Sequence, residues 1–176
     1  MESTFIGVWM FGREKLPKWA IAASAWLVSI GTMISALWIL AANSFMQEPV
    51  GFEIQNGKAV LTDFMALLTN PQLLVEFPHT IFGALATGGL VVGGISAYNL
   101  LRKRHMEFFR KSFNIAMVIA FISGVAIAFT GHSQAQHLME SQPMKMAASE
   151  ALWEDSEDPA GWTAIGGIDT ENQENT

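Results

Sequence analysis

The residue best suited to carry chemistry in this sequence is His79, in the segment FPHT (residues 77–80) at the start of a long uncharged stretch. If that stretch crosses a membrane, an ionisable group at this depth is costly and usually functional. A neutral imidazole nitrogen is a common ligand of haem iron, and a flat macrocycle needs a flat helix face beside it. Small residues do follow His79 at helical spacing: Gly83, Ala86, Thr87 and Gly94. The alternative is an interfacial histidine hydrogen-bonded to a neighbour, beside a helix-packing face.

A second candidate pair, Lys145 and Glu150, lies in the segment QPMKMAASEALW (residues 142–153). Strong helix formers after a proline predict a short helix there. Five residues of regular helix separate the two side chains by about 140°, so they do not form an i,i+4 ion pair. A lysine can donate a hydrogen bond to a quinol or quinone oxygen, and a glutamate can accept a proton. The alternative is a solvated amphipathic helix with ordinary surface charges.

Glu2, Ser3 and Ser35 are candidates for a proton path. Glu2 would lie inside the membrane if further residues preceded the short apolar segment that follows it. A buried glutamate can relay protons, and serine hydroxyls can extend a polar path. The alternative is an exposed Glu2 at the start of the chain, with Ser35 hydrogen-bonded to a neighbouring helix or to its own backbone.

Composition places all of these residues in a membrane protein. Of the 176 residues, 51% are hydrophobic and only 15% are charged, whereas soluble domains are usually about one quarter charged. With histidine counted as neutral, three stretches carry no charge at all: 19–47, 77–101 and 112–139. Runs of this length predict transmembrane helices. The pattern excludes an ordinary soluble enzyme, a nucleic-acid-binding module and a disordered chain, and the lack of cysteine excludes disulfides and thiolate metal sites.

The expected fold is therefore all-α: a polytopic membrane helix bundle with three full transmembrane helices, a partial one and an external loop. We expect the partial span at about 3–12, since it has about half the necessary length, and the full spans at about 19–42, 77–101 and 113–131. Pro78 would then lie in the first turn of its helix, where its missing N–H costs nothing. We expect a transmembrane bundle segment over 1–131 and an external loop over 132–176; its quinol-binding role is implied only by the family resemblance given below.

Basic residues predict the orientation of these spans. They cluster in the loops 13–18 and 102–111, which we therefore place in the cytoplasm. The segments 43–76 and 132–176 then lie on the opposite side. Within 43–76, helical spacing of apolar residues predicts a short interfacial helix over about 61–69, and turns are expected at 49–51 and 56–57.

Together, these stretches resemble subunit I of the cytochrome bd-type quinol oxidases. The matching segments are ESTFIGVWMFGREKL (2–16), SALWILAANSFMQEPVG (35–51), FPHT (77–80) and GHSQAQ…QPMKMAASEALW (131–153), and IDTENQ (168–173) is similar to part of the family's external loop. The order of the motifs, their sidedness and the separation of His79 from Lys145 all fit. One departure is Glu48, which stands where we would expect asparagine or a similar residue.

The resemblance implies a role for each candidate residue. His79 matches the axial ligand of the low-spin haem b and of its iron. Lys145 and Glu150 match the lysine and glutamate of the quinol-oxidising loop. Glu2, Ser3 and Ser35 match polar positions on the proton path toward the oxygen-reducing haems.

The resemblance also implies a function: the electron-entry segment of a terminal respiratory oxidase. Quinol (ubiquinol or menaquinol) would be oxidised at the outer face, electrons would pass to the low-spin haem b, and oxygen would be reduced to water. The complete subunit would also hold a high-spin haem b and a haem d, or a second haem b. The implied partners are oxidase subunit II, the remainder of subunit I and membrane lipid. The implied location is a bacterial-type plasma (inner) membrane, with the outer segments periplasmic.

A full subunit I is much longer than this chain. We therefore expect a fragment that lacks the amino-terminal helices and the carboxy-terminal half, including the methionine that is the second axial ligand of the low-spin haem, and that is inactive when isolated. An alternative of another class is a non-catalytic membrane scaffold or assembly fragment without a cofactor. It would pack against other helices through small residues: Gly83, Gly88, Gly93 and Gly94.

Overall fold

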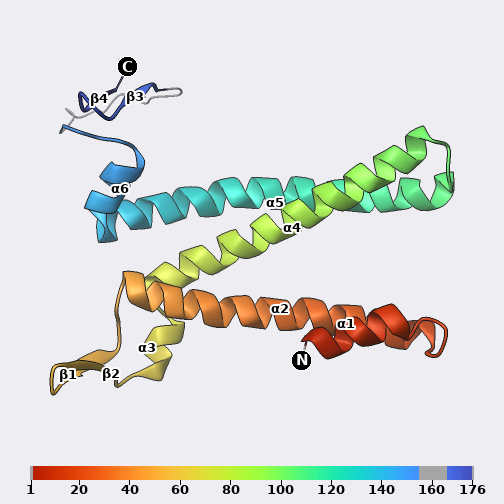
Figure 1. The fold of residues 1–176 in the computed structure, drawn as a ribbon, viewed down its shortest axis with the longest axis horizontal. Helices are drawn as coiled ribbons and strands as arrows, with labels where there is room; N and C mark the ends of the chain where they lie inside the picture. Colours follow the sequence, from red (N-terminus) through yellow and green to blue (C-terminus); the bar gives the residue numbers. More distant parts are fainter. Residues whose placement is uncertain (1, 155–165, 176) are drawn as a thin grey trace. The chain divides into compact units, whose positions relative to one another are not determined.

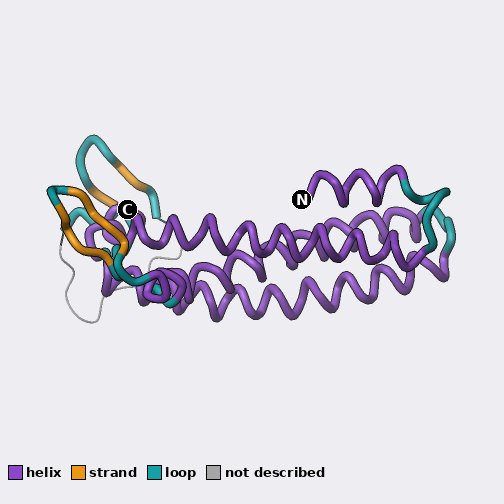
Figure 2. Tube along the Cα trace, turned by 90° about the horizontal axis from the view of Figure 1, so that it is seen from below, coloured by secondary structure: helices purple, strands orange, loops and turns teal. Residues whose placement is uncertain are grey.

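A computed structural model of the chain describes residues 2–154 and 166–175, and within them the structure is mainly helical (Figure 1). Three stretches are long and apolar enough to cross a membrane: Lys18–Gln47, Phe64–Leu101 and Met106–Ser141. The chain divides into two compact units, Met1–Gly131 and His132–Thr176, and each is described by itself. Strands among the described residues are confined to two short hairpins (Figure 2).

Helices α1 (Glu2–Phe11) and α2 (Lys18–Gln47) pack against each other and are joined by a tight turn. The amide of Gly12 donates to the carbonyl of Val8 at 2.8 Å, which closes the last turn of α1. A Cβ on Gly12 would collide with that same carbonyl oxygen, so the turn requires glycine here. Pro17 then precedes α2 in extended conformation, which suits the residue before a helix.

The segment after α2 contains a β-hairpin, β1 (Phe52–Gln55) paired antiparallel with β2 (Lys58–Leu61). Asn56 and Gly57, which join the strands, both have positive φ (53° and 75°). Two such residues in succession form the type I′ turn that matches the twist of paired strands. The turn expected at 56–57 is thus confirmed, whereas the strands around it were not predicted.

Helix α3 (Phe64–Leu68) is shorter than the helix expected over 61–69. Leu61 pairs with Phe52 at the open end of the hairpin and is not helical. Asp63 then caps α3, because its carboxylate accepts from the amides of Met65 and Ala66 at 2.9 and 3.1 Å. The expected first residue was therefore wrong: apolar periodicity continues through the end of β2, but the cap determines where the helix starts.

Helix α4 (Pro71–Leu101) begins earlier than the span expected at about 77. Asn70 caps it by accepting from the amide of Gln72 at 2.8 Å, and the Asn70 amide group donates to the carbonyl of Glu48 at 2.8 Å. Pro71, and not Pro78, occupies the first turn, so Pro78 lies about two turns inside the helix. The placement of Pro78 in the first turn was wrong because the uncharged stretch marks the apolar part of the helix and not its cap.

Helix α5 (Met106–Ser141) extends beyond the expected 113–131 at both ends and packs against α4 inside the first unit. At Gly89, an added Cβ would lie 2.9 Å from the carbonyl oxygen of Ala116 and 3.0 Å from the Cβ of Ala120. Near the end of α4, the hydroxyl of Ser96 donates to that of Ser112 at 3.0 Å. Small residues thus let the two helices approach closely, as is usual between membrane helices.

Large apolar side chains cover the faces of the long helices that are exposed in the described chain. Trp26 on α2 and Phe121 on α5 are 69% and 72% exposed. The buried apolar residues among those described are few and mostly small: Ala41, Leu73, Ala116 and Ala120. A soluble protein rarely exposes this much contiguous apolar surface, so lipid or further helices must cover it.

In the second unit, helix α6 (Pro143–Ser149) follows the end of α5, and a small hairpin pairs β3 (Ile168–Asp169) with β4 (Glu174–Asn175). Asp169 organises the turn of this hairpin. Its carboxylate accepts from the amides of Glu171 and Asn172 and from the side-chain amide of Asn172.

Candidate functional site

His79 lies in the first half of α4 and is half-buried. Its ring nitrogen Nδ1 lies 3.1 Å from the hydroxyl oxygen of Thr130 on α5. Within residues 2–154 and 166–175, the second ring nitrogen, Nε2, makes no hydrogen bond. One nitrogen is therefore held by the protein, and the other can bind a ligand.

The helix face that continues from His79 was expected to be flat because its residues are small. No neighbouring atoms of the described chain lie against this face at its glycines. A Cβ on Gly83 would meet no neighbouring atom within 4 Å, and the same holds for Gly94. Thr87 satisfies its own hydroxyl by donating to the carbonyl of Gly83 at 2.9 Å. This face can therefore accept a flat apolar group without displacing any side chain of the described chain.

A carboxylate lies one turn before His79. Glu76 is half-buried, and its Oε2 accepts a hydrogen bond of 3.2 Å from the hydroxyl of Ser44 near the end of α2. Ser44 itself is fully buried. The pair links the C-terminal end of α2 to the start of α4 and thereby helps to fix the helix that carries His79.

Lys145 and Glu150 lie in the other unit, on α6 and directly after it. Both side chains are exposed. The helix ends in a Schellman motif, in which the amide of Leu152 donates to the carbonyl of Ala147 at 2.9 Å and Ala151 adopts a positive φ of 52°. The helix expected from the segment 142–153 is thus present, with Lys145 inside it and Glu150 at its end.

The three residues of the expected proton path are placed on α1 and α2. Ser3 is exposed in the first turn of α1, and Ser35 is exposed in the second half of α2. In the described part of the chain neither hydroxyl has a hydrogen-bond partner. The side chain of Glu2 lies outside what the structure describes.

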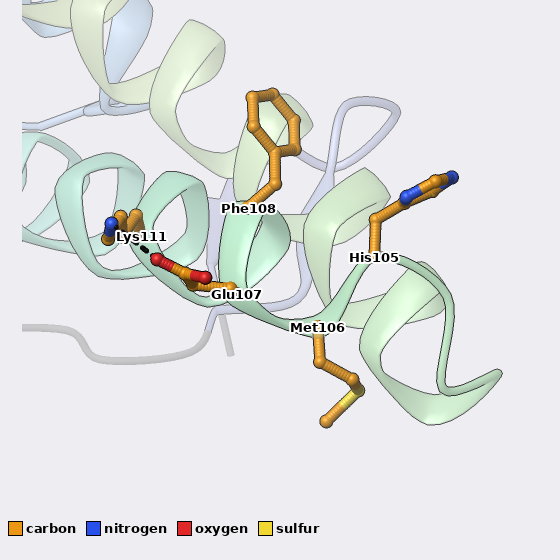
Figure 3. Close-up of a pocket in the computed structure, with 5 residues that line it drawn as sticks. All are labelled: His105, Met106, Glu107, Phe108 and Lys111. Atoms are coloured by element: carbon orange, nitrogen blue, oxygen red, sulfur yellow. Dashed lines mark hydrogen bonds and ion pairs between the residues drawn. The ribbon is translucent and has the colours of Figure 1, made fainter.

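A separate cavity of about 450 Å³ lies at the start of α5, in the basic loop. Its lining residues are His105, Met106, Glu107, Phe108 and Lys111. Lys111 and Glu107 form an exposed ion pair of 2.9 Å, and Figure 3 shows the ring of His105 pointing away from it. The cavity contains none of the expected site residues.

A family model described as cytochrome bd terminal oxidase subunit I matches residues 1–176, the whole chain. The chain belongs to this family. The prediction drawn from the segments around Glu2, His79 and Lys145 is thus confirmed, and the chain is a multi-pass membrane protein of the bacterial respiratory oxidase type.

Two curated relatives and one solved structure show how much of this subunit the chain represents. It is 60% identical over 176 residues to cytochrome bd ubiquinol oxidase subunit 1 of Bacillus subtilis (strain 168), covering 100% of this chain and 38% of the relative. It is 35% identical to cytochrome bd-II ubiquinol oxidase subunit 1 of Escherichia coli (strain K12), covering 99% of this chain and 34% of the relative. The bd oxidase structure from Geobacillus thermodenitrificans superposes with a TM-score of 0.82 at 30% identity. The match covers 99% of this chain and 40% of the chain in that structure.

The chain therefore spans about two fifths of the length of the relatives it matches. The likeness to the solved bd oxidase also confirms the all-α membrane bundle expected for a subunit I chain. Thr130 and Gly131, which contact His79, were missed by sequence reasoning. Their only signal is a threonine and a glycine at the end of an apolar stretch, which many packed membrane helices share.

Proposed function

We propose that this chain is the electron-entry segment of a quinol-oxidising terminal oxidase, in which His79 would hold the iron of the low-spin haem b. The observation that carries the proposal is the state of the imidazole: Nδ1 is bound by Thr130, while Nε2 has no partner in the described chain. Iron-binding histidines are commonly held in this way, with one nitrogen on an oxygen atom of the protein and the other on the metal. The alternative, a histidine that only hydrogen-bonds to a neighbour, assigns no ligand to Nε2.

The residues around His79 fit a haem. The face of α4 below it is open at Gly83 and Gly94, so a macrocycle can approach without a clash. When bound, haem b accepts and releases one electron at a time. The protein's own contribution is to hold the imidazole, to exclude water with the apolar faces of α4 and α5, and to tune the iron through the hydrogen bond to Nδ1.

We place quinol oxidation in the segment 132–176, which was expected to be a loop but begins with the last ten residues of α5. Lys145 donates a hydrogen bond to a quinol oxygen, and Glu150 accepts a proton as the quinol is oxidised. Both are exposed on or beside a short helix, which supports access for a membrane-borne substrate. Since the basic loops 13–18 and 102–111 are assigned to the cytoplasm, the protons leave on the periplasmic side.

We assign Glu2, Ser3 and Ser35 to proton transfer toward the oxygen-reducing centres of the complete enzyme. The exposed hydroxyls of Ser3 and Ser35 support this role, because polar groups on membrane helices rarely face lipid. The remainder of subunit I and oxidase subunit II then cover these faces. The complete enzyme would also hold a high-spin haem b and a haem d, or a second haem b, which would supply the chemistry for reducing oxygen to water.

The direct test of the haem assignment is the haem content of the complete subunit I, assembled as an oxidase, with His79→Ala. Pyridine haemochrome analysis should show one haem b fewer per enzyme than in the parent. His105→Ala is the matched control, since His105 is exposed in the basic loop and should leave the haem content unchanged. Equal haem content in His79→Ala and the parent would overturn the assignment.

A second candidate function, a scaffold without cofactor, draws on the same open glycines. Gly83, Gly88 and Gly94 have room beside them for another helix, whereas Gly93 is already used within the chain, since its added Cβ would lie 3.1 Å from the sulfur of Met117. The purified chain, supplied with haem and scanned for a Soret band, separates the two. A band lost in His79→Ala favours the oxidase segment, and no band favours the scaffold for the chain on its own.

A further inference from the structure

His79 does not simply touch α5; it is held there by two consecutive residues. Nδ1 of the ring lies 3.1 Å from the Oγ1 of Thr130. The next residue, Gly131, lies so close that an added Cβ would be 3.2 Å from Cε1 of the ring and 3.6 Å from Nδ1. The edge of the imidazole therefore lies against the backbone of α5, in a space that only glycine leaves open without some adjustment of the ring.

The hydroxyl of Thr130 determines the direction of the hydrogen bond to His79. Its Oγ1 lies 2.8 Å from the carbonyl oxygen of Ala126 and 3.3 Å from that of Ile127. Carbonyl oxygens only accept, and the short 2.8 Å contact with Ala126 favours donation of the single hydroxyl hydrogen of Thr130 to the backbone. The hydroxyl can then only accept from His79, which requires a hydrogen on Nδ1 of the ring.

We infer that Thr130 and Gly131 form a contact site for the imidazole that selects the Nδ1–H tautomer of His79. The lone pair of Nε2 is then available to the iron. The inference rests on the proposed haem ligation by His79. Thr130 is thus a positioning residue: it acts on the iron only through the imidazole. The backbone carbonyl of Ala126 completes the chain of hydrogen bonds and keeps the threonine hydroxyl oriented.

This arrangement has a consequence for the haem itself. A hydrogen bond from Nδ1–H to an oxygen makes Nε2 a stronger electron donor. A stronger donor stabilises ferric over ferrous iron and therefore lowers the midpoint potential of the haem. Loss of the Thr130 hydroxyl should raise that potential and weaken haem retention by about 10- to 100-fold, the usual effect of removing an outer partner of a metal-binding histidine.

The test uses the complete oxidase, with substitutions in this segment of subunit I. Thr130→Val keeps the shape and removes the hydroxyl, whereas Thr130→Ser keeps the hydroxyl. Thr32→Val is the matched control, because Thr32 also donates to its own helix, at 2.9 Å to Val28, and is exposed on α2. A redox titration of the low-spin haem band should show a higher midpoint potential only in Thr130→Val, together with reduced haem content.

Three outcomes separate the possibilities. A potential and haem content in Thr130→Val equal to those of Thr32→Val overturn the role of Thr130, and haem ligation by His79 then still stands if His79→Ala loses the band. A band that survives in His79→Ala overturns the proposed function and this inference with it. Rescue by Thr130→Ser supports the hydrogen bond and excludes a general packing defect.

A second measurement does not depend on the haem. Solid-state NMR of this chain in lipid bilayers, with ¹⁵N-labelled histidine and His105, His132 and His137 replaced by glutamine, reports which ring nitrogen of His79 carries the hydrogen. The inference predicts a protonated Nδ1 and an unprotonated Nε2, with this preference lost in Thr130→Val. A spectrum with the hydrogen on Nε2 contradicts it.

Discussion

The hydroxyl of Ser44 donates a hydrogen bond of 3.2 Å to Oε2 of Glu76 and thereby links the C-terminal end of α2 to the first turns of α4. Ser44 is 0% exposed, so its hydroxyl is shielded from water. Because Glu76 lies one turn before His79, this bond helps to hold the helix that presents the imidazole.

Removing this donor should destabilise the outer end of the bundle. We expect Ser44→Ala to lower the free energy of unfolding by about 1–3 kcal/mol, because a part-buried carboxylate loses a partner. Unfolding in mixed micelles, followed by circular dichroism, measures the change. Ser29→Ala is the control, since Ser29 is exposed on α2, and equal stability of the two variants would contradict the prediction.

The contact of α4 with α5 depends on Gly89. We expect Gly89→Leu to separate the helices and to cost about 1–3 kcal/mol or more, because even a Cβ there would lie 2.9 Å from the carbonyl oxygen of Ala116. The neighbouring Gly88→Leu should be tolerated, since a Cβ at that position meets nothing within 4 Å. Thermal stability of the two purified variants checks the difference. Equal losses of stability would contradict the claim that the contact of α4 with α5 depends on Gly89.

The proposed quinol site predicts a selective kinetic defect. In the complete oxidase, Glu150→Ala should lower quinol-driven turnover by about 10²- to 10⁴-fold, the usual contribution of a proton-accepting group. Lys145→Ala should raise the KM for quinol, because the lysine is proposed to bind a substrate oxygen. Oxygen reduction with artificial donors that bypass quinol should remain unchanged in both.

Matched controls for these two variants lie in the hairpin of the other unit. Lys58→Ala and Glu53→Ala remove exposed charges of the same kind from β2 and β1. Their quinol oxidation should match that of the parent. If Lys145→Ala and Glu150→Ala behave like these controls, the site lies elsewhere.

The turn at Asp169 should respond to acid. The side-chain amide of Asn172, followed by the backbone amides of Asn172 and Glu171, holds the pKa of Asp169 below its ordinary value of 3.8. A lowered folded pKa means that the turn is favoured above pH 3.8 and loses this support as the pH falls through the folded pKa. We expect Asn172→Ala to raise the pKa of Asp169 toward 3.8, and a carboxyl NMR titration that finds it unmoved would contradict this.

Hydropathy and charge predicted the number of long helices correctly, because lipid requires long uncharged stretches whatever their neighbours. They did not predict that α4 starts at Pro71, since Asn70 caps the helix through a side chain and Glu76 is accommodated inside it by Ser44. Such starts depend on polar contacts between segments that are distant in sequence.

The candidate site shows the same division. His79 stands out in the sequence because an ionisable residue at the start of an apolar span is uncommon. Thr130, the residue that orients it, does not stand out, because it lies 51 positions away and resembles any threonine that bonds back to its own helix. Only the packing of α4 on α5 brings the two together.

The central claim is that the imidazole of His79 binds haem iron near the outer face of the membrane. An experimental structure of the complete oxidase that contains this segment tests it most directly. We expect the iron of a low-spin haem b bonded to Nε2 of His79, with Nδ1 still on Thr130. A ring turned toward lipid or another helix, with no porphyrin beside it, would contradict the account.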